Sequence, residues 1–455
     1  MTQVFRAVMG AGLLAGAGTL SLGAQSMALP AADPVGIARS GAQVAYGFSL
    51  EAASTNPALL ASLKEQSGFH VALGRDMMGL QQSLEANQRT YESLERNRTL
   101  AAFGLATRLN SAWTLGLKLD QPYMRHAELA TGAPTRFQGT GIDLSTHRLE
   151  AQAAWAFSPA LSLGFGLGVA RLSYGSTSLL RLGVPQDPTL AASATNPLEG
   201  LVEQGVGQDG HKVVPSYSLG LRWALSPRWT LGFTHQSGLK GDLALTGSYL
   251  GASTGLYGND GLSSAPIGTA TRAAVLLATA SPLATTATLQ LPSQTTLGMR
   301  HRISPMITWE ADLRWTSANL RVPALPSVGT PSGTVNAPIT LPEGKSHFGL
   351  QVSAEVELSK FWLLRGGLAL EQRSIEETNI EPLLGGARTS AFSFGAGYRT
   401  WGGELSIGYQ YRQSEDQDTR KGDGVWSATG YRPTGTRVRL EGMGHLLALG
   451  FRKSF

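Results

Sequence analysis

The chain has 455 residues, of which 42% are hydrophobic and 15% are charged, with 56 glycines, no cysteine and a formal net charge of +5. The lack of cysteine excludes disulfides, thiolate metal sites and cysteine nucleophiles. Because the basic residues are dispersed and form no Lys/Arg cluster, we expect no nucleic-acid partner.

The sequence of residues 1–28 indicates that the protein is exported. A single early arginine, Arg6, precedes an uncharged run of small and apolar residues that ends at Ala24. This order is typical of a secretory signal peptide, with cleavage expected after Ala28. A membrane anchor is the alternative, but the run is rich in Gly and Ala rather than in Leu. No later apolar run is long enough for a transmembrane helix, which excludes an α-helical membrane protein.

Residues 29–64 predict a short N-terminal segment rather than a spanning strand. The stretch DPVGIARSGAQVAYGFSLEAAS is rich in Gly and Ala and too irregular for a strand that crosses a bilayer. Asn56 is a favourable N-cap and Pro57 suits the first helical position, so a short helix should begin there. Ahead of a closed barrel, such a segment either extends into the periplasm or folds back into the lumen as a plug.

Residues 65–455 predict amphipathic β-strands. Apolar and polar residues alternate in MITWEADLRWTSANL from Met306, in HFGLQVSAEVEL from His347 and in ELSIGYQYRQ from Glu404. Such alternation marks strands with one apolar and one polar face. The strands extend over about 10 to 15 residues, which exceeds the usual five or six and is sufficient for a tilted membrane strand.

The connections between these strands alternate between short turns and long loops. Short turns are expected at 110–111, 158–159, 226–227, 304–305, 359–360 and 402–403, and long loops near 79–98, 124–141, 176–212, 247–284, 320–344, 374–388 and 416–439. This alternation gives about fourteen strands and is typical of an outer-membrane barrel with short periplasmic turns. Seven of the nine tryptophans lie within four residues of a short turn, as an aromatic girdle at one rim predicts.

The predicted fold is therefore all-β, a closed antiparallel transmembrane β-barrel of about 14 strands in the bacterial outer membrane. Closure is required because every backbone N–H and C=O group within lipid needs a partner, and only a closed sheet has no edge. Polar side chains should then line a water-filled lumen, while apolar side chains face lipid.

No enzyme chemistry and no cofactor or metal site is predicted. The eight histidines are scattered without HxxxH or HExxH spacing, and no GxSxG motif occurs. We interpret the lumen carboxylates Glu310, Asp312, Glu355 and Glu404 as solvated lining charges rather than as acid–base groups. The glycines of GFGLGVA, which begins at Gly164, predict a close approach of whatever fills the lumen.

The stretch GIARSGAQVAYGFSLEAASTNPALLASL resembles the N-terminal hatch of the FadL family of outer-membrane transporters for long-chain fatty acids and other hydrophobic compounds. Similar stretches are WTLGFTHQSGLKGDLALTG, LPSQTTLGMRHRISPMITWEADLRWTS, WLLRGGLALEQRS and FSFGAGYRTWGGELSIGYQYRQ. The ending HLLALGFRKSF is similar to the terminal assembly strand of such barrels, with Phe455 as the assembly signal, although Lys453 departs from the apolar residue often found there.

The resemblance implies a monomeric barrel in which residues 29–64 form a hatch that blocks straight-through diffusion. The hatch signature falls on Gly36, Gly41, Asn56, Pro57 and Ala58. Family members bind a hydrophobic ligand among the outer loops, pass it to a deeper site beside the N-terminus and release it through a kink in the third strand. The implied partners are the ligand, outer-membrane lipid, lipopolysaccharide and the barrel assembly machinery.

Two sets of candidate site residues follow. Apolar tracts in the outer loops predict either ligand capture by Leu179, Leu180, Arg181, Val275 and Leu276 or, equally, loops that pack on themselves. In the third strand, WTLGLKLDQPYM, Gly116 and Pro122 are the candidates for a kink, but the favoured interpretation is that Pro122 simply ends the strand at the outer rim.

The predicted function is uptake of long-chain fatty acids or similar hydrophobic molecules, by capture at the outer loops and passive, hatch-gated lateral release into the membrane. The alternatives are a general diffusion porin and an uptake channel for aromatic or aliphatic hydrocarbons. An adhesin or phage receptor also stays open, because long outer loops permit it.

Overall fold

The computed structural model of the chain describes residues 33–46, 50–63, 65–84, 90–92, 98–129, 139–183, 201–253, 285–323, 328–330, 333–335, 344–375, 383, 386–400, 402–415, 417–419, 425–427, 430–432 and 438–455. The expected signal peptide, residues 1–28, lies outside these residues. Within the described ranges, no helix is both long and apolar enough to cross a membrane.

The described chain begins with short helices and continues as β-strands. The helices are α2 (Pro34–Ala38), α3 (Leu50–Ala53) and the 3₁₀ helix η1 (Pro57–Ser62). The strands are β1 (Ser67–Leu84), β2 (Thr90–Glu92), β3 (Arg98–Arg108), β4 (Trp113–Asp120), β5 (Met124–Glu128), β6 (Gly141–Ala156), β7 (Leu161–Gly183), β8 (Leu201–Ala224), β9 (Trp229–Gln236), β10 (Leu239–Ser253), β11 (Thr285–Leu291), β12 (Gln294–Arg302), β13 (Ile307–Thr316), β14 (Val328–Thr330), β15 (Gly333–Val335), β16 (His347–Glu357), β17 (Trp362–Glu371), β18 (Thr389–Thr400), β19 (Gly403–Ser414), β20 (Gln417–Thr419), β21 (Val425–Ser427), β22 (Gly430–Arg432) and β23 (Val438–Ser454).

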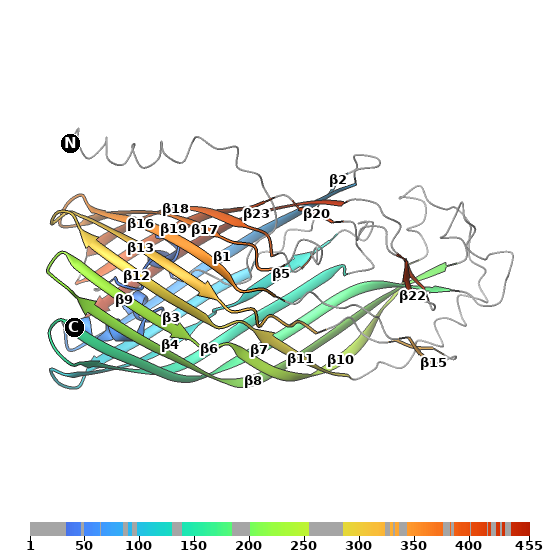
Figure 1. Cartoon of the computed structure of the whole chain (residues 1–455), viewed down its shortest axis with the longest axis horizontal. Coiled ribbons are helices and arrows are strands. Elements are labelled where there is room, and N and C mark those ends of the chain that lie inside the picture. The colour runs from blue at the N-terminus through green and yellow to red at the C-terminus, as the bar shows by residue number, and fades with distance from the viewer. Residues whose placement is uncertain are drawn as a thin grey trace.

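These strands form a closed antiparallel barrel (Figure 1). Each spanning strand pairs with its neighbour in the chain, and β1 closes the ring by pairing with β23 from Gly68↔Ser454 to Leu84↔Val438. Three spans consist of two consecutive segments each, namely β4 with β5, β9 with β10, and β11 with β12. The predicted 14-stranded closed barrel is thereby confirmed.

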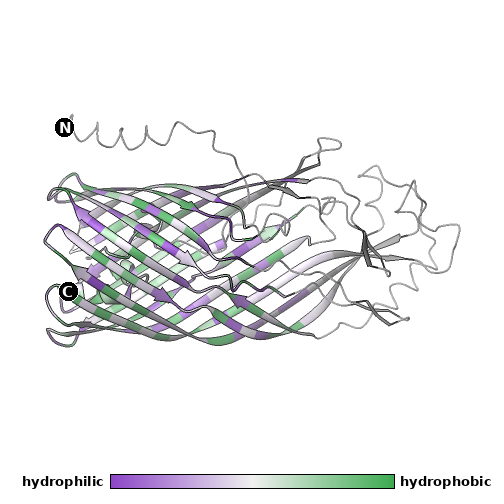
Figure 2. Ribbon diagram, in the orientation of Figure 1, coloured by the Kyte–Doolittle hydropathy of each residue, from purple (hydrophilic) through white to green (hydrophobic). Residues whose placement is uncertain are grey.

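The barrel wall carries its polar side chains inside and its apolar side chains outside. On β16, His347, Gln351 and Glu355 are buried, whereas Phe348 and Leu350 between them are exposed by 48% and 45%. Hydrophilic and hydrophobic residues alternate along the ribbons in the same way (Figure 2). Because a water-soluble barrel would bury its apolar face, this arrangement fits a wall surrounded by lipid.

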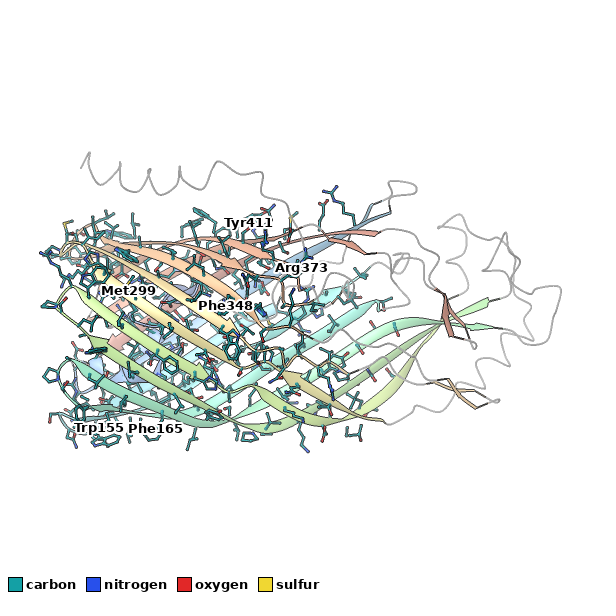
Figure 3. All side chains as sticks on the ribbon, viewed as in Figure 1. Trp155, Phe165, Met299, Phe348, Arg373 and Tyr411 are labelled. Atoms are coloured by element: carbon teal, nitrogen blue, oxygen red, sulfur yellow. The ribbon has the colours of Figure 1, made fainter. Side chains whose placement is uncertain are left out.

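Aromatic side chains gather at the short-turn end of the barrel. Trp113 on β4 and Trp155 on β6 stack with their ring centroids 6.0 Å apart. Trp155 and Phe165 project away from the wall in Figure 3 and are exposed by 36% and 46%. Amphipathic rings are favoured at a membrane–water boundary, so this rim fits one interface of the bilayer.

At the opposite end, β7 and β8 form a hairpin that is longer than the sequence predicts. Their ladder continues to the pair Gly183↔Leu201, so the loop expected at 176–212 is wrong at both of its ends. The outward residues change from Val169 to the exposed Arg171 on β7. The part of a strand that lies outside the bilayer needs no apolar outer face. Its residues are therefore as polar as those of a loop, so the sequence predicts a loop there.

Candidate functional site

The N-terminal segment, defined here as residues 33–46 and 50–63, lies inside the short-turn half of the barrel. Its helical turns are enclosed by the ring of strands in Figure 1. All of residues 33–46 are buried. The segment contacts strands on opposite sides of the ring, since α2 lies against β17, β18, β19 and β23 while η1 lies against β4, β6, β7 and β8.

Two caps and one tight turn give the segment its shape. The Asp33 side chain accepts a hydrogen bond from the Gly36 N–H at 2.7 Å and caps α2. The Asn56 side chain accepts from the Ala58 N–H at 3.0 Å, and Pro57 begins η1. The predicted short helix at Asn56–Pro57 is therefore confirmed, as a 3₁₀ helix. Gly41 adopts a φ of 86°, which favours glycine, in the turn that follows α2.

Two carboxylates of β13 hold this turn. Asp312 accepts hydrogen bonds from the backbone N–H groups of Gln43 and Val44 at 2.9 and 3.1 Å. Glu310 accepts one from the Ala45 N–H at 2.7 Å and forms an ion pair with Arg39 at 2.7 Å. Because these groups are fully buried, the wall supplies the acceptors that water would otherwise provide.

A second buried chain of polar groups begins and ends on the N-terminal segment. Its members, each bonded to the next, are Tyr46, Glu355, Arg365, Glu404, Arg452 and Glu51. Burial raises the pKa of Tyr46 to about 12, so its hydroxyl stays a donor to Glu355 at neutral pH. The interpretation of these wall carboxylates as solvated lining charges is wrong, because all four are at most 7% exposed and are bonded to protein groups.

Glycines of the wall permit this close fit. A Cβ atom on any of them would lie 3.0 Å or less from an atom of the N-terminal segment; they are Gly68, Gly116, Gly164, Gly220, Gly232, Gly298, Gly367, Gly395, Gly408 and Gly450. The close approach predicted for Gly164 is confirmed, since its neighbours are the backbones of Pro57 and Ala58. Gly166 and Gly168 of the same motif instead contact Glu150 and the β6 backbone.

The outer half of the barrel contains an apolar cluster instead of a polar lining. Its buried members are Tyr123, Ala127, Leu129, Ile142, Leu144, Ala170, Leu172, Tyr174, Val214, Leu239, Leu243, Leu245, Leu289, Leu291, Leu320, Val322, Ile375 and Leu383. Most belong to wall strands, while Leu320, Val322, Ile375 and Leu383 lie outside the long strands. The prediction of a water-filled polar lumen is therefore wrong for this half of the barrel.

Strand alternation does not reveal this cluster, because two irregularities reverse which face of the strand points into the barrel. Between β9 and β10, Ser237 and Gly238 interrupt the alternation, so Leu239 and Leu243 are buried although unbroken alternation would place them on the lipid side. Pro292 and Ser293 have the same effect between β11 and β12. On β6 and β7 the sequence does indicate an apolar interior, because Leu144 and Leu172 occupy positions that alternation places on the inward face.

The third span is interrupted next to this cluster. β4 ends at Asp120 and β5 begins at Met124, and both segments pair with β6. β3 pairs with β4 only between Phe103↔Leu119 and Arg108↔Thr114, and among the described strands β5 pairs with β6 alone. The β3–β5 break, as we name it, is therefore a stretch of wall without a backbone ladder between β3 and β5.

Pro122 lies within this break and not at the outer end of the strand. β5 continues beyond Pro122 with the same neighbour, β6. Gly116, the other candidate for a kink, lies in an unbroken ladder opposite Ala106 and Gln152. There it gives room to Leu60 of η1, whose Cδ1 atom would be 2.7 Å from a Cβ at residue 116.

The N-terminal segment lies between two cavities. On the short-turn side, a cavity of about 760 Å³ is lined by Tyr46, Leu59 and Leu60 of the segment and by charged wall residues such as Arg300. On the other side, a cavity of about 50 Å³ is lined by Gly41, Val44 and Thr55 of the segment together with Gln121 and Pro122 of the break.

The remaining predicted site residues are dispersed. Leu179, Leu180 and Arg181 lie on β7, opposite Gly205, Gln204 and Glu203 of β8, and their side chains are not among those described. Val275 and Leu276 lie outside the described residues. Phe455 pairs with Ser67 through two backbone hydrogen bonds of 2.9 Å at the seam of the barrel. Ligand capture by the five loop residues stays a prediction.

Comparisons with known proteins identify the family. The profile of the family described as outer membrane protein transport protein (OMPP1/FadL/TodX) matches residues 13–455. A comparison with curated protein sequences finds no significant match.

Solved structures of low sequence identity share the fold. A Pseudomonas aeruginosa FadL homologue is 16% identical with a TM-score of 0.72, and the alignment covers 95% of this chain and 100% of that one. The P. putida toluene transporter TodX is 13% identical with a TM-score of 0.62, covering 93% and 98%. The Ralstonia pickettii toluene transporter TbuX is 14% identical with a TM-score of 0.56, also covering 93% and 98%. With its family profile matched over almost its whole length, the chain belongs to the OMPP1/FadL/TodX family of outer-membrane transport proteins.

Proposed function

We propose that this protein takes up hydrophobic compounds passively and releases them sideways into the outer membrane. The observation that carries the proposal is the apolar cluster inside the outer half of the barrel, which adjoins the β3–β5 break through Tyr123. An apolar molecule that enters this half finds a favourable surface, whereas the short-turn half beyond it presents buried charges such as Glu310 and Asp312.

The outside of the break supports a lateral exit. Leu73 on β1, Leu119 on β4 and Leu149 on β6 surround it and are exposed by 61%, 37% and 46%. A molecule that leaves here enters hydrocarbon, where each buried CH₂ group contributes about 0.8 kcal/mol. No coupled energy source is required when the compound moves down its own gradient.

The N-terminal segment acts, in this proposal, as a hatch that prevents diffusion straight through the barrel. Its support is the close packing of the N-terminal segment against wall glycines such as Gly164 and Gly367 and against two sets of buried charges. A general diffusion porin would conduct ions steadily in a planar bilayer. We expect this protein to conduct little until residues 29–64 are deleted.

The substrate class proposed first is long-chain fatty acids. Its support is Arg125 on β5, a buried cation at the edge of the apolar cluster, whose Nε donates to the carbonyl of Leu383 at 2.6 Å. Uncharged hydrocarbons are the second class. The Tyr123 and Tyr174 hydroxyls both donate to backbone carbonyls, so these two groups leave the cluster with an apolar surface.

Uptake by reconstituted protein tests the proposal. Leu172→Ser places a hydroxyl in the cluster, and Leu167→Ser makes the same change on the lipid-facing side of β7, where the side chain is 64% exposed. We expect Leu172→Ser to reduce uptake of labelled oleate or toluene about tenfold, with Leu167→Ser close to the unmodified protein. Equal uptake by the two variants would contradict a route through the cluster, and the compound whose uptake falls identifies the substrate class.

A further inference from the structure

Arg75 of β1 is a cation on the lipid-facing side of the barrel wall. It is exposed, and it lies between Leu73 and Met77 in the outward-facing row of β1. Leu447 of β23 and Thr99 of β3 are opposite it in the two neighbouring ladders. Among the residues that the structure describes, none forms a hydrogen bond or an ion pair with Arg75. Because a charge on the lipid face is costly without a partner, an anion from the membrane would stabilise this arginine.

The position of Arg75 along its strand places it near the outer boundary of the bilayer. β1 begins at Ser67 at the short-turn end, so Arg75 lies about 20 Å above that end at ~3.3 Å per residue and a strand tilt of about 40°. The apolar band of such a barrel is about 25 Å tall. The long arginine side chain can therefore extend its guanidinium to the headgroup layer. Short turns face the periplasm in these barrels, so this layer belongs to the outer leaflet.

A histidine and two tyrosines lie beside Arg75 on the same face of the wall. His445 is the next outward-facing residue of β23 after the one opposite Arg75, which places the two residues about 7–8 Å apart. The His445 Nδ1 atom is 2.7 Å from the Tyr409 hydroxyl, and its ring centroid is 5.3 Å from that of Tyr411. Tyr411 lies on the outside of the wall (Figure 3), and its hydroxyl has no bonded partner within the described ranges. The group offers N–H and O–H donors next to a guanidinium, which suits a phosphate.

No carboxylate neutralises this group in the part of the chain that the structure describes. Glu441, an outward-facing acid further along β23, already pairs with Arg439 at 3.1 Å. Asp76 follows Arg75 in the chain but is buried on the inward face, where it pairs with Arg412. The lipid-facing surface around Arg75 therefore has an excess of positive charge.

An apolar surface extends from this polar group toward the short-turn end. It is formed by β18, β19, β23 and β1, which pair in this order across the seam of the barrel. Its outward residues Phe394, Ile407, Leu449 and Leu73 are exposed by 53%, 43%, 59% and 61%. With neighbouring strands ~4.8 Å apart, the four strands span about 14 Å, which is room for several acyl chains side by side.

We propose that this surface is a binding site for lipopolysaccharide, in which Arg75, His445 and Tyr411 bind a phosphate of the lipid A part and β18, β19, β23 and β1 hold its acyl chains. A guanidinium matches the geometry of phosphate well. Lipopolysaccharide is the phosphorylated lipid of the outer leaflet, and it carries more acyl chains than a phospholipid, as the width of the apolar surface favours. The bound lipid bridges the first and last strands of the barrel from outside, so the proposal does not depend on the route of uptake through the lumen.

Native mass spectrometry of the full-length protein in detergent tests this site. The probes are bisphosphorylated lipid A, the same lipid without its phosphates, phosphatidylglycerol and inorganic phosphate. We expect lipid A to bind at least about tenfold more tightly than each of the other three, since it alone combines the phosphate with several acyl chains.

Three variants and one matched control assign the residues. We expect Arg75→Ala to weaken lipid A binding about tenfold and Tyr411→Phe about threefold, because a charge-assisted hydrogen bond contributes more than a neutral one. Arg75→Lys keeps the charge and should lie between Arg75→Ala and the parent. Arg228→Ala removes an exposed arginine at the short-turn end and should bind lipid A like the parent. All of these side chains lie on the outside of the wall or at its rim, and circular dichroism confirms that each variant is folded.

The outcomes distinguish the proposed lipid from other anions. Selective loss of lipid A binding in Arg75→Ala, with unchanged binding of the lipid that lacks phosphates, supports the site. Equal affinity of the parent and Arg75→Ala for lipid A, or equal weakening by Arg75→Ala and Arg228→Ala, overturns it. Binding of phosphatidylglycerol or inorganic phosphate as tight as that of lipid A overturns the assignment to lipopolysaccharide.

Discussion

Arg39→Ala is the substitution that tests the docking of the N-terminal segment most directly. Arg39 and Glu310 are 2.7 Å apart and almost completely shielded from solvent, with side-chain exposures of 1% and 0%. Removing the arginine leaves the Glu310 carboxylate buried beside Asp312 without its counter-ion. Loss of one partner of a buried ion pair costs about 3–5 kcal/mol. The undocked population of the segment should therefore rise by a factor of roughly 100 to 4,000.

Ion conductance of the purified protein in planar bilayers measures this population. We expect rare openings in the unmodified protein and frequent ones in Arg39→Ala. The double variant Arg39→Met/Glu310→Gln should restore the closed state, because the neutral amide still accepts the hydrogen bond from the Ala45 N–H. Arg399→Ala is the control. Its ion pair with Glu357 lies at the rim, where both side chains are about 40% exposed, and its distance to Glu404 is long at 4.0 Å, so both contacts contribute little.

Equal conductance of Arg39→Ala and Arg399→Ala, in barrels that fold equally well, would refute the reasoning. It would mean either that the buried pair contributes nothing to docking or that the segment does not obstruct the pore. Conductance of the double variant separates these two explanations, since an unobstructed pore conducts in every variant.

Three further predictions use the same segment. Gly367→Ala should raise conductance, because its Cβ would lie 2.5 Å from the segment's backbone, whereas at Gly366 the nearest atom is 3.7 Å away and Gly366→Ala should change nothing. The Ser40 and Ser393 hydroxyls are 2.6 Å apart, so a Ser40→Cys/Ser393→Cys disulfide added to the Arg39→Ala variant should fix the turn and keep conductance low until a reductant is added; high conductance of the oxidised protein would contradict this. Burial raises the pKa of Asp33 from 3.8 to about 6. The contribution of Asp33 to docking is therefore complete below about pH 3.8 and is lost as the pH rises through about 6. Conductance should increase over this interval, and Asp33→Asn should abolish the increase.

The barrel could be predicted from the sequence because its physical requirement is local and repetitive. A strand in lipid must present an apolar residue at every second position, as Phe348, Leu350 and Val352 do on β16. The cap at Asn56 was equally visible, since an N-cap depends on a few neighbouring residues. The sequence pattern at the two ends of a strand depends less on lipid. At these ends, the sequence predicts loops at positions where the structure still continues as strand.

The inside of the barrel could not be predicted in the same way. Whether Leu239 and Leu243 face lipid or lumen depends on the irregularity at Ser237–Gly238, whose backbone geometry does not follow from alternation. The carboxylates Glu310 and Asp312 have partners more than 260 residues away in the chain. Such pairings depend on the three-dimensional path of the chain, which local sequence patterns do not show.

The apolar cluster of the outer half is occupied by the protein's own side chains, among them Leu320, Val322 and Ile375. In the route proposed above, an incoming molecule must therefore displace these side chains rather than fill an empty cavity. A polar solute of the same size gains too little free energy on burial to displace them. Selectivity for apolar molecules would then depend on the contacts that the protein's own side chains lose when the molecule binds, as well as on the contacts that the molecule gains.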